Sequence, residues 1–286
     1  MGIVSLMTRL EMSDFFDATV DGSVTVVCGS NPIMAGWRFV TFAAVDVASG
    51  TTISVATGDT EMAIVPLNGH ASVHVNGAQF DVRRSDVFAE KGSIVYVPPK
   101  SVVRIDAHTA VTLGMGSAPA EERYDARLLD GANVRVEMRG GGAARRQVTH
   151  LLSPPIEAHR LIVYEVLVPR GSWSGWPPHC HDGLDGSPYL EETYYFEHRP
   201  ANGFGIHRNF RESAGLDDVF VVPHRSLITV PAGYHSSAAS PGSHMYFLNV
   251  LAGDLVHEDR RTPPCFDERY VWIDGHWDDD PLTLPS

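Results

Sequence analysis

One short stretch decides how this sequence is interpreted: residues 176–181 read Trp-Pro-Pro-His-Cys-His. Residues two apart on a β-strand project from the same face, so His179 and His181 can point at one ion while Cys180 points away. Neutral imidazole nitrogens are good ligands for first-row divalent metals. The stretch therefore predicts a strand that carries part of a metal site.

Two later segments add ligands of the same kind. Residues 190–195 read Leu-Glu-Glu-Thr-Tyr-Tyr, and residues 231–235 read Pro-Ala-Gly-Tyr-His. Three imidazoles and one carboxylate suit a divalent metal such as zinc, manganese, iron, nickel or cobalt. Because adjacent strand residues face opposite ways, only one of Glu191 and Glu192 can point at the ion.

The composition excludes several classes of protein. The 286 residues are 43% hydrophobic and 20% charged with a net charge of -13, which fits a globular chain with two domains and disfavours nucleic-acid binding. Three scattered cysteines, Cys28, Cys180 and Cys265, form no Cys-x-x-Cys pair, which favours a reducing compartment. No signal-like leader and no membrane-spanning run is seen. The sequence thus predicts a soluble, cytoplasmic protein that binds neither nucleic acid nor membranes.

The pattern of apolar residues predicts a mainly β protein. The chain holds 26 glycines and 19 prolines, and short apolar runs between such turn residues are typical of a sandwich or barrel. The expected strands are Val24–Val27, Trp37–Val45, Ala71–Val75, Ile94–Val97, Val102–Ile105, Leu161–Val168, Val219–Val222, Leu227–Val230 and Met245–Leu251.

An internal echo predicts two copies of one barrel. Residues 93–100 and 226–233 both read as a strand followed by a proline turn, but only the second copy is followed by a histidine, His235. We therefore expect an N-terminal barrel without a metal site over residues 1–140 and a C-terminal barrel with it over residues 141–286. The flexible connection falls at Gly140-Gly141-Gly142.

The ordered motifs resemble those of the cupin superfamily, in which His-x-His and Glu precede Pro-x-Gly and a last His. The closer resemblance is to the 5-deoxy-glucuronate isomerase family of myo-inositol breakdown, related to the 4-deoxy-threo-hexosulose-uronate ketol-isomerases. It is dense from about residue 145 onward and rests on residues 146–148, 165–166, 169–182, 190–195, 203–204, 230–235 and 248–253. The chain departs from the family at Phe196–Arg199 and His224–Ser226. The resemblance implies two jelly-roll barrels of the cupin type in one chain, a bicupin.

The resemblance also implies a metal site and a reaction. The ligands would be His179, His181, Glu192 and His235, holding one divalent ion, zinc or manganese first and otherwise iron, nickel or cobalt. The reaction would be an aldose–ketose isomerisation of 5-deoxy-glucuronate to 5-dehydro-2-deoxy-gluconate. The ion would act as a Lewis acid that stabilises the enediolate.

Such a reaction needs a group that carries a proton between neighbouring carbons. The candidates are Glu191, Tyr194, His207 and a metal-bound hydroxide. Tyr194 should share the face of Glu192, since it lies two residues further along the strand. Alternatively, Tyr194 is a core residue whose hydroxyl has a hydrogen-bond partner, and His207 is an exposed histidine on a strand.

The substrate carries a carboxylate, which favours an arginine because the guanidinium fork pairs with both oxygens. Arg208 is the first candidate, and Arg199 and Arg225 are further ones. An ordinary surface arginine is the alternative for each. Tyr246 either contacts substrate or fills the barrel.

The first half contains His70, His74 and His108 without a Glu or a Pro-x-Gly-linked His. We therefore expect a metal-free barrel that supports the second and helps to form a homo-oligomer. Two other functions remain open. An Fe(II)-dependent cupin dioxygenase would consume oxygen, and a non-catalytic sugar-acid-binding barrel would turn over no uronate.

Overall fold

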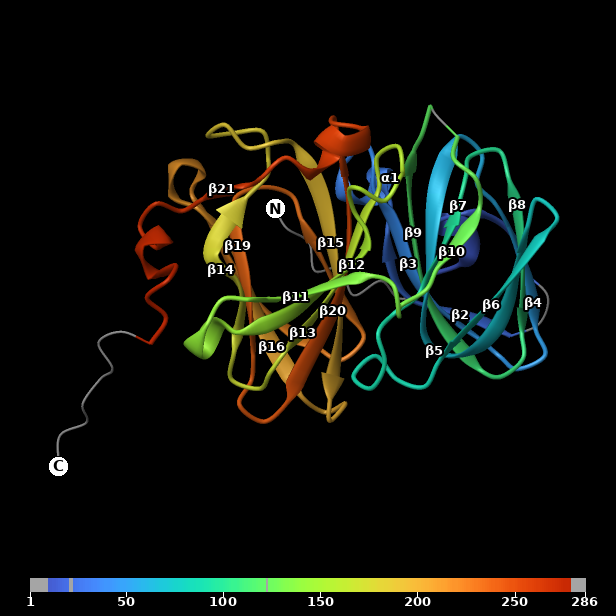
Figure 1. The fold of residues 1–286 in the computed structure, drawn as a ribbon, viewed down its shortest axis with the longest axis horizontal. Helices are drawn as coiled ribbons and strands as arrows, with labels where there is room; N and C mark the ends of the chain where they lie inside the picture. Colours follow the sequence, from blue (N-terminus) through green and yellow to red (C-terminus); the bar gives the residue numbers. More distant parts are fainter. Residues whose placement is uncertain (1–9, 21–22, 122, 279–286) are drawn as a thin grey trace.

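The computed structural model describes residues 10–20, 23–121 and 123–278, and most of the regular structure in them is β (Figure 1). The prediction of an all-β, cupin-type fold is confirmed. The helical segments are single turns: α1 (Pro32–Ala35), η1 (Met12–Asp14), η2 (Gly142–Ala144), η3 (Glu212–Ala214), η4 (His257–Arg261) and η5 (Val271–Ile273). Within the described ranges, no helix is long and apolar enough to cross a membrane.

The first half of the chain folds around a ten-stranded antiparallel sheet with the main order β1-β4-β8-β5-β9-β3-β2, from which β6, β7 and β10 branch. Its strands are β1 (Asp17–Val20), β2 (Val24–Ser30), β3 (Thr41–Val47), β4 (Thr52–Ala56), β5 (Thr60–Val75), β6 (Ala78–Arg84), β7 (Ile94–Val97), β8 (Val102–Ala107), β9 (Val111–Pro119) and β10 (Arg127–Leu129). Ile53, Val73 and Ile105 are fully buried in its core. This half therefore encloses a hydrophobic core of its own.

The second half contains two antiparallel sheets. The six-stranded sheet has the order β11 (Arg135–Arg139), β12 (Arg146–Leu152), β13 (Ile162–Val168), β20 (His244–Gly253), β15 (Leu190–Arg199) and β18 (Ser226–Val230). The five-stranded sheet has the order β17 (Leu216–Pro223), β16 (Phe204–Arg211), β19 (Tyr234–Ala239), β14 (Trp173–Cys180) and β21 (Cys265–Phe266). Val222 and Ala239 of one sheet pack against Phe196 and Phe247 of the other, so the two sheets share a core.

The two halves lie side by side and share a second core (Figure 1). Phe42 and Ile94 of the first half cluster there with Tyr195 and Leu248 of the second. Gly114 of β9 permits the close approach, since a Cβ at this position would lie 2.6 Å from Cδ2 of Leu248.

The division into two domains at residue 140 stays a prediction, and its first residues lie outside the described ranges. One strand bears on it: β11 (Arg135–Arg139) precedes residue 140 but pairs with β12 of the second half. One expected strand, Trp37–Val45, begins later than predicted, at Thr41. The reason is that the N–H groups of residues 38–40 donate to the carboxylate of Glu191 instead of a neighbouring strand.

Candidate metal centre

One face of the six-stranded sheet forms the floor of a cavity of about 490 Å³. Successive strand residues alternate between faces, so every second residue of four strands lines it. Tyr194 of β15 lies opposite Asn249 of β20, which lies opposite Tyr164 of β13. The lining from this sheet includes Arg146, Val148, Ile162, Tyr164, Val166, Leu190, Glu192, Tyr194, Phe247, Asn249 and Leu251.

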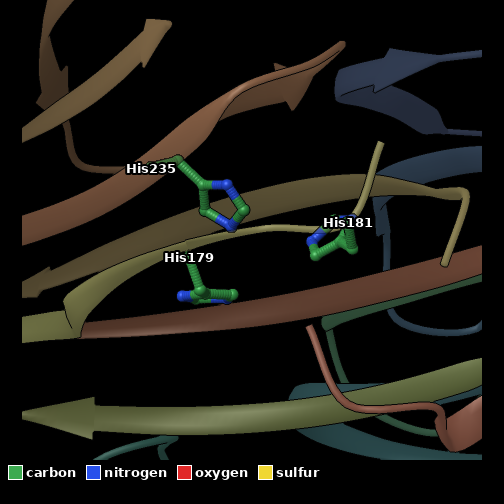
Figure 2. Close-up of side chains that lie close together, drawn as sticks. All are labelled: His179, His181 and His235. Atoms are coloured by element: carbon green, nitrogen blue, oxygen red, sulfur yellow. The ribbon is translucent and has the colours of Figure 1, made fainter. Parts of the chain in front are cut away.

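Three histidines come together (Figure 2), and two of them, His179 and His181, line this cavity. His179 on β14 pairs in register with His235 on β19, and His181 directly follows the end of β14. The ligand nitrogens of all three lie within 4.8 Å of one another. His235 is fully buried, and its ring centroid lies 4.5 Å from that of His179 and 5.1 Å from that of His181.

Glu192 completes the cluster from the opposite sheet. Its Oε2 lies 2.9 Å from Nε2 of His181 and 3.2 Å from Nε2 of His235. The structure thus brings together all four residues that the sequence singled out, and it places Cys180 outside the cavity lining. Their role as metal ligands stays a prediction.

The tautomers of the cluster fit a bound cation. Nδ1 of His181 lies 2.9 Å from the carbonyl oxygen of Leu190, to which it donates in the neutral ring, leaving the Nε2 lone pair to face the Glu192 carboxylate. Two acceptors that face each other need a proton or a metal ion between them. Nε2 of His235 is buried, and its approach to Oε2 of Glu192 at 3.2 Å lacks hydrogen-bond geometry, a cost that coordination would remove.

The protonation states of His179 and Glu192 also favour a bound cation. Burial, together with the neighbouring His235 and His181, lowers the pKa of His179 well below its ordinary value and keeps this ring neutral. Burial alone would raise the pKa of Glu192, but its contacts with His181 and His235 lower it far below the ordinary range. A neutral His179 and an ionised Glu192 are the protonation states that a divalent metal requires, whereas the Glu192 carboxylate, against the effect of burial, raises the pKa of His181.

Tyr194 lines the cavity beside this cluster, as the spacing from Glu192 predicts. Burial and the nearby Glu192 carboxylate raise its pKa well above the ordinary value, so its hydroxyl keeps its proton. His207 is buried behind it, with ring centroids 5.0 Å apart. Nδ1 of His207 lies 2.7 Å from Oγ of Ser237 and its Nε2 lies 3.0 Å from Oδ1 of Asn209. Since both nitrogens are occupied and burial lowers its pKa to about 3, His207 supports the site as a neutral ring.

The proposal of Glu191 as a proton carrier requires a correction. Its side chain points away from Glu192 and accepts the N–H groups of residues 38–40 of the first half at 2.6–2.8 Å, as well as the hydroxyl of Tyr189 at 3.1 Å. The strand alternation that selects Glu192 for the cavity sends Glu191 to the opposite face. Glu191 therefore joins the two halves and has no access to a substrate in the cavity.

The two predicted substrate contacts also lie elsewhere. Arg208 is half-exposed on the outside of β16 and forms an ion pair with Asp217 at 2.7 Å. Tyr246 is fully buried between the two halves, where its hydroxyl donates to Glu165 at 2.7 Å. Both corrections follow from alternation, because the neighbours of Arg208 on β16 are buried and Phe247, next to Tyr246 on β20, lines the cavity.

The further arginine candidates are paired with the first half of the chain. Arg199 forms an ion pair with Asp86, and Arg225 forms one with Asp46 at 2.5 Å. Several residues that line the cavity were not recognised from the sequence, among them Arg146, Tyr164, Trp176 and Asn249. Strand alternation predicts which of these side chains face the cavity, but only once the pairing of β12, β13 and β20 is known.

In the first half of the chain, an aspartate that the sequence did not indicate lies beside two of the three histidines. His70 and His108 lie with Asp81, their ligand atoms within 4.8 Å of one another, while His74 pairs with Asp106 at 2.9 Å. Asp81 and His108 are exposed, and Oγ of Ser72 lies 2.7 Å from Nε2 of His108. The expectation of a metal-free first half stays a prediction.

Facing antiparallel sheets that direct three histidines and a glutamate into one cavity define a β-barrel protein of the cupin type. The chain belongs to the KduI/IolB family, which matches residues 15–273. This match confirms the resemblance drawn from the motifs.

Named relatives cover most of the chain. It is 38% identical over 238 residues to a 5-deoxy-glucuronate isomerase from Geobacillus thermodenitrificans, covering 82% of this chain and 87% of that one. It is 32% identical over 242 residues to a 5-deoxy-glucuronate isomerase from Bacillus subtilis, covering 82% and 88%. The crystal structure of an IolB-like protein from Salmonella typhimurium matches with a TM-score of 0.83 and 32% identity, covering 90% and 98%. A Bacillus subtilis oxalate decarboxylase, at a TM-score of 0.58 and 12% identity over 90% and 79%, shares the fold alone.

Proposed function

We propose that this chain is a 5-deoxy-glucuronate isomerase, an intramolecular oxidoreductase that forms 5-dehydro-2-deoxy-gluconate in the cytoplasmic breakdown of myo-inositol. The observation that carries the proposal is the cluster of His179, His181, His235 and ionised Glu192, in which all but His235 line the cavity. The relatives named for this activity support it, and the family match spans the residues of the cluster.

The cluster is suited to hold one divalent ion, with zinc or manganese as the first candidates. The ion would supply a Lewis acid next to the substrate carbonyl, which makes the neighbouring C–H more acidic. The ligand set contains no thiolate, because Cys180 lies outside the cavity lining. Borderline and hard divalent ions suit such a set of nitrogen and oxygen donors.

The protein contributes a hydrogen-bond donor beside the cluster. The hydroxyl of Tyr194 keeps its proton, as the raised pKa requires, and can donate a hydrogen bond to a substrate oxygen on which negative charge develops. Asn249 lies opposite Tyr194 in the strand pairing and donates its amide to the carbonyl oxygen of Thr193 at 3.2 Å, which fixes its orientation. These two side chains form a rigid polar row on the cavity floor.

Apolar side chains surround this row and limit the access of water. Ile162, Val166, Phe247 and Leu251 line the cavity from the floor, and Phe266 lines it from the facing sheet. A site with few waters strengthens the hydrogen bonds and ion pairs made within it. The same walls protect a reactive enediolate from side reactions.

The test is an isomerisation assay on 5-deoxy-glucuronate, followed by NMR, with 4-deoxy-hexosulose-uronate in parallel and elemental analysis of the purified protein. We expect turnover of the first compound together with about one divalent ion per chain. Oxygen consumption without isomerisation would favour a dioxygenase instead. Binding of the uronate without turnover, in protein that contains metal, would favour a sugar-acid-binding barrel.

A further inference from the structure

Arg146 is the first residue of β12 and lines the cavity together with Val148, two residues further along the same face. Its Nη1 donates to two backbone carbonyl oxygens, those of Ala144 at 3.1 Å and Trp176 at 3.2 Å. These two contacts fix the guanidinium plane. They leave the remaining N–H donors of the fork available to the cavity.

Arg146 has no carboxylate partner among the described residues, unlike the other cavity arginine of the β11–β12 pair. Arg139, directly opposite in register, forms an ion pair with Glu137. Burial and the positive charge of Arg139 lower the pKa of Arg146 to about 10. Arg146 is partly buried, and Glu137 and Asp274 offset its charge only in part, so its position costs free energy and needs a reason outside the folded chain itself.

We infer that Arg146 binds the carboxylate of the sugar acid, and so selects an acidic substrate and sets its orientation. The inference rests on the proposed function and replaces the earlier candidate, Arg208. A guanidinium fork pairs with both oxygens of a carboxylate, which is a strong and directional interaction.

The position of Arg146 also fits the chemistry at the other end of the substrate. Trp176, which Arg146 contacts, lies three residues before His179 on the same strand. Arg146 and His179 line the same cavity of about 490 Å³, so one small molecule can reach both side chains. With its carboxylate at Arg146, the sugar acid directs its carbonyl end toward the histidine cluster.

The test compares Arg146→Gln, Arg146→Lys and the control Arg208→Gln on 5-deoxy-glucuronate and on 5-deoxy-glucose, its neutral analogue. We expect Arg146→Gln to lower kcat/KM for the uronate by roughly 100-fold, mainly through KM, because a charge-assisted bidentate contact is lost. Activity on the neutral analogue and the bound metal should not change. Arg146→Lys should recover part of the loss, and Arg208→Gln should behave like the unchanged protein.

Two outcomes overturn the inference. One is that Arg146→Gln keeps the preference for the uronate over the neutral analogue. The other is that it loses activity on both compounds together with metal or thermal stability, which indicates a structural role. If the unchanged protein isomerises no uronate, the proposed function fails by itself. Calorimetric titration with glucuronate then still tests Arg146: binding weakened by at least about 10-fold in Arg146→Gln supports the inference, and equal binding contradicts it.

Discussion

Glu61 and Glu191 make equivalent contacts across the boundary between the two halves of the chain, because each carboxylate accepts backbone N–H groups of the other half. Glu61, the second residue of β5, accepts the N–H groups of residues 159–161 of the second half at 2.6–2.8 Å. Glu191, the second residue of β15, accepts those of residues 38–40 of the first half over the same range of distances. Each carboxylate therefore holds a segment of backbone of the other half that is not part of a strand ladder. The equivalence of these two glutamates also supports the prediction that the chain contains two copies of one barrel.

Replacing Glu191 by Ala should reduce stability more than chemistry. Three backbone N–H groups lose their acceptor, and a buried unsatisfied donor costs about 1–3 kcal/mol, so we expect the free energy of unfolding to fall by about 3 kcal/mol or more. Urea denaturation measures this, with the exposed Glu268→Ala as control. At a temperature where the variant is folded, kcat should stay within a few-fold of the unchanged protein. A loss of kcat by orders of magnitude at full stability would restore Glu191 as a proton carrier.

Removing one imidazole of the cluster should remove the metal. We expect His235→Ala to lower the bound divalent ion to a small fraction and isomerase activity by more than about 100-fold, since even changes around the ligands cost 10–100-fold in affinity. Elemental analysis and the isomerisation assay measure the two effects, and Arg208→Gln on the neighbouring strand is the control. Full activity in a metal-free His235→Ala protein would rule out the proposed mechanism.

Tyr194→Phe separates the effect of the hydroxyl as a hydrogen-bond donor from the effect of the bound metal. The substitution removes the hydroxyl but keeps the ring that packs on Phe196 and His207. Losing one donor to a developing oxyanion typically costs about 100- to 1000-fold in kcat, and we expect a loss of that size. Bound metal should remain at the level of the unchanged protein. A variant with unchanged kcat would show that Tyr194 only fills the core.

The sequence predicted the ligand cluster because its geometry is local. The His-x-His spacing places His179 and His181 on one face, alternation allows only one of Glu191 and Glu192 there, and the family resemblance implies Glu192. The position of His235 after a proline turn follows from its own motif. These residues needed only the assumption that their segments are strands, which the structure confirms for β14, β15 and β19.

The misplaced residues depend on contacts that are distant in the chain. Glu191 accepts hydrogen bonds from residues about 150 positions earlier, and no local sequence pattern predicts that pairing. Arg208 points outward because its neighbours His207 and Asn209 are buried, and their burial became known only from the packing of the two sheets. Arg146 could be recognised only after Trp176 and β11 were known to lie beside it.

Buried neutral histidines should make the protein less stable in mild acid. Burial, together with the adjacent Arg135, lowers the pKa of His150 to about 4, and Nε2 of this ring accepts a hydrogen bond from Arg135 at 2.7 Å. In the unfolded chain a histidine titrates near 6.5. Between pH 6.5 and about 4 the unfolded state therefore binds a proton that the folded state does not, and stability falls as the pH falls through this window.

The slope of that loss identifies the residue. One histidine contributes at most about 1.4 kcal/mol per pH unit, so His150→Gln should flatten the dependence of the unfolding free energy on pH by up to that amount. Urea denaturation at pH 7, 6 and 5 measures the slope, in protein treated with EDTA so that loss of metal from the cluster does not add to it. The exposed His244→Gln is the control and should keep the original slope. An unchanged slope in His150→Gln would mean that this ring is already protonated in the folded protein, in conflict with the hydrogen bond that it accepts from Arg135.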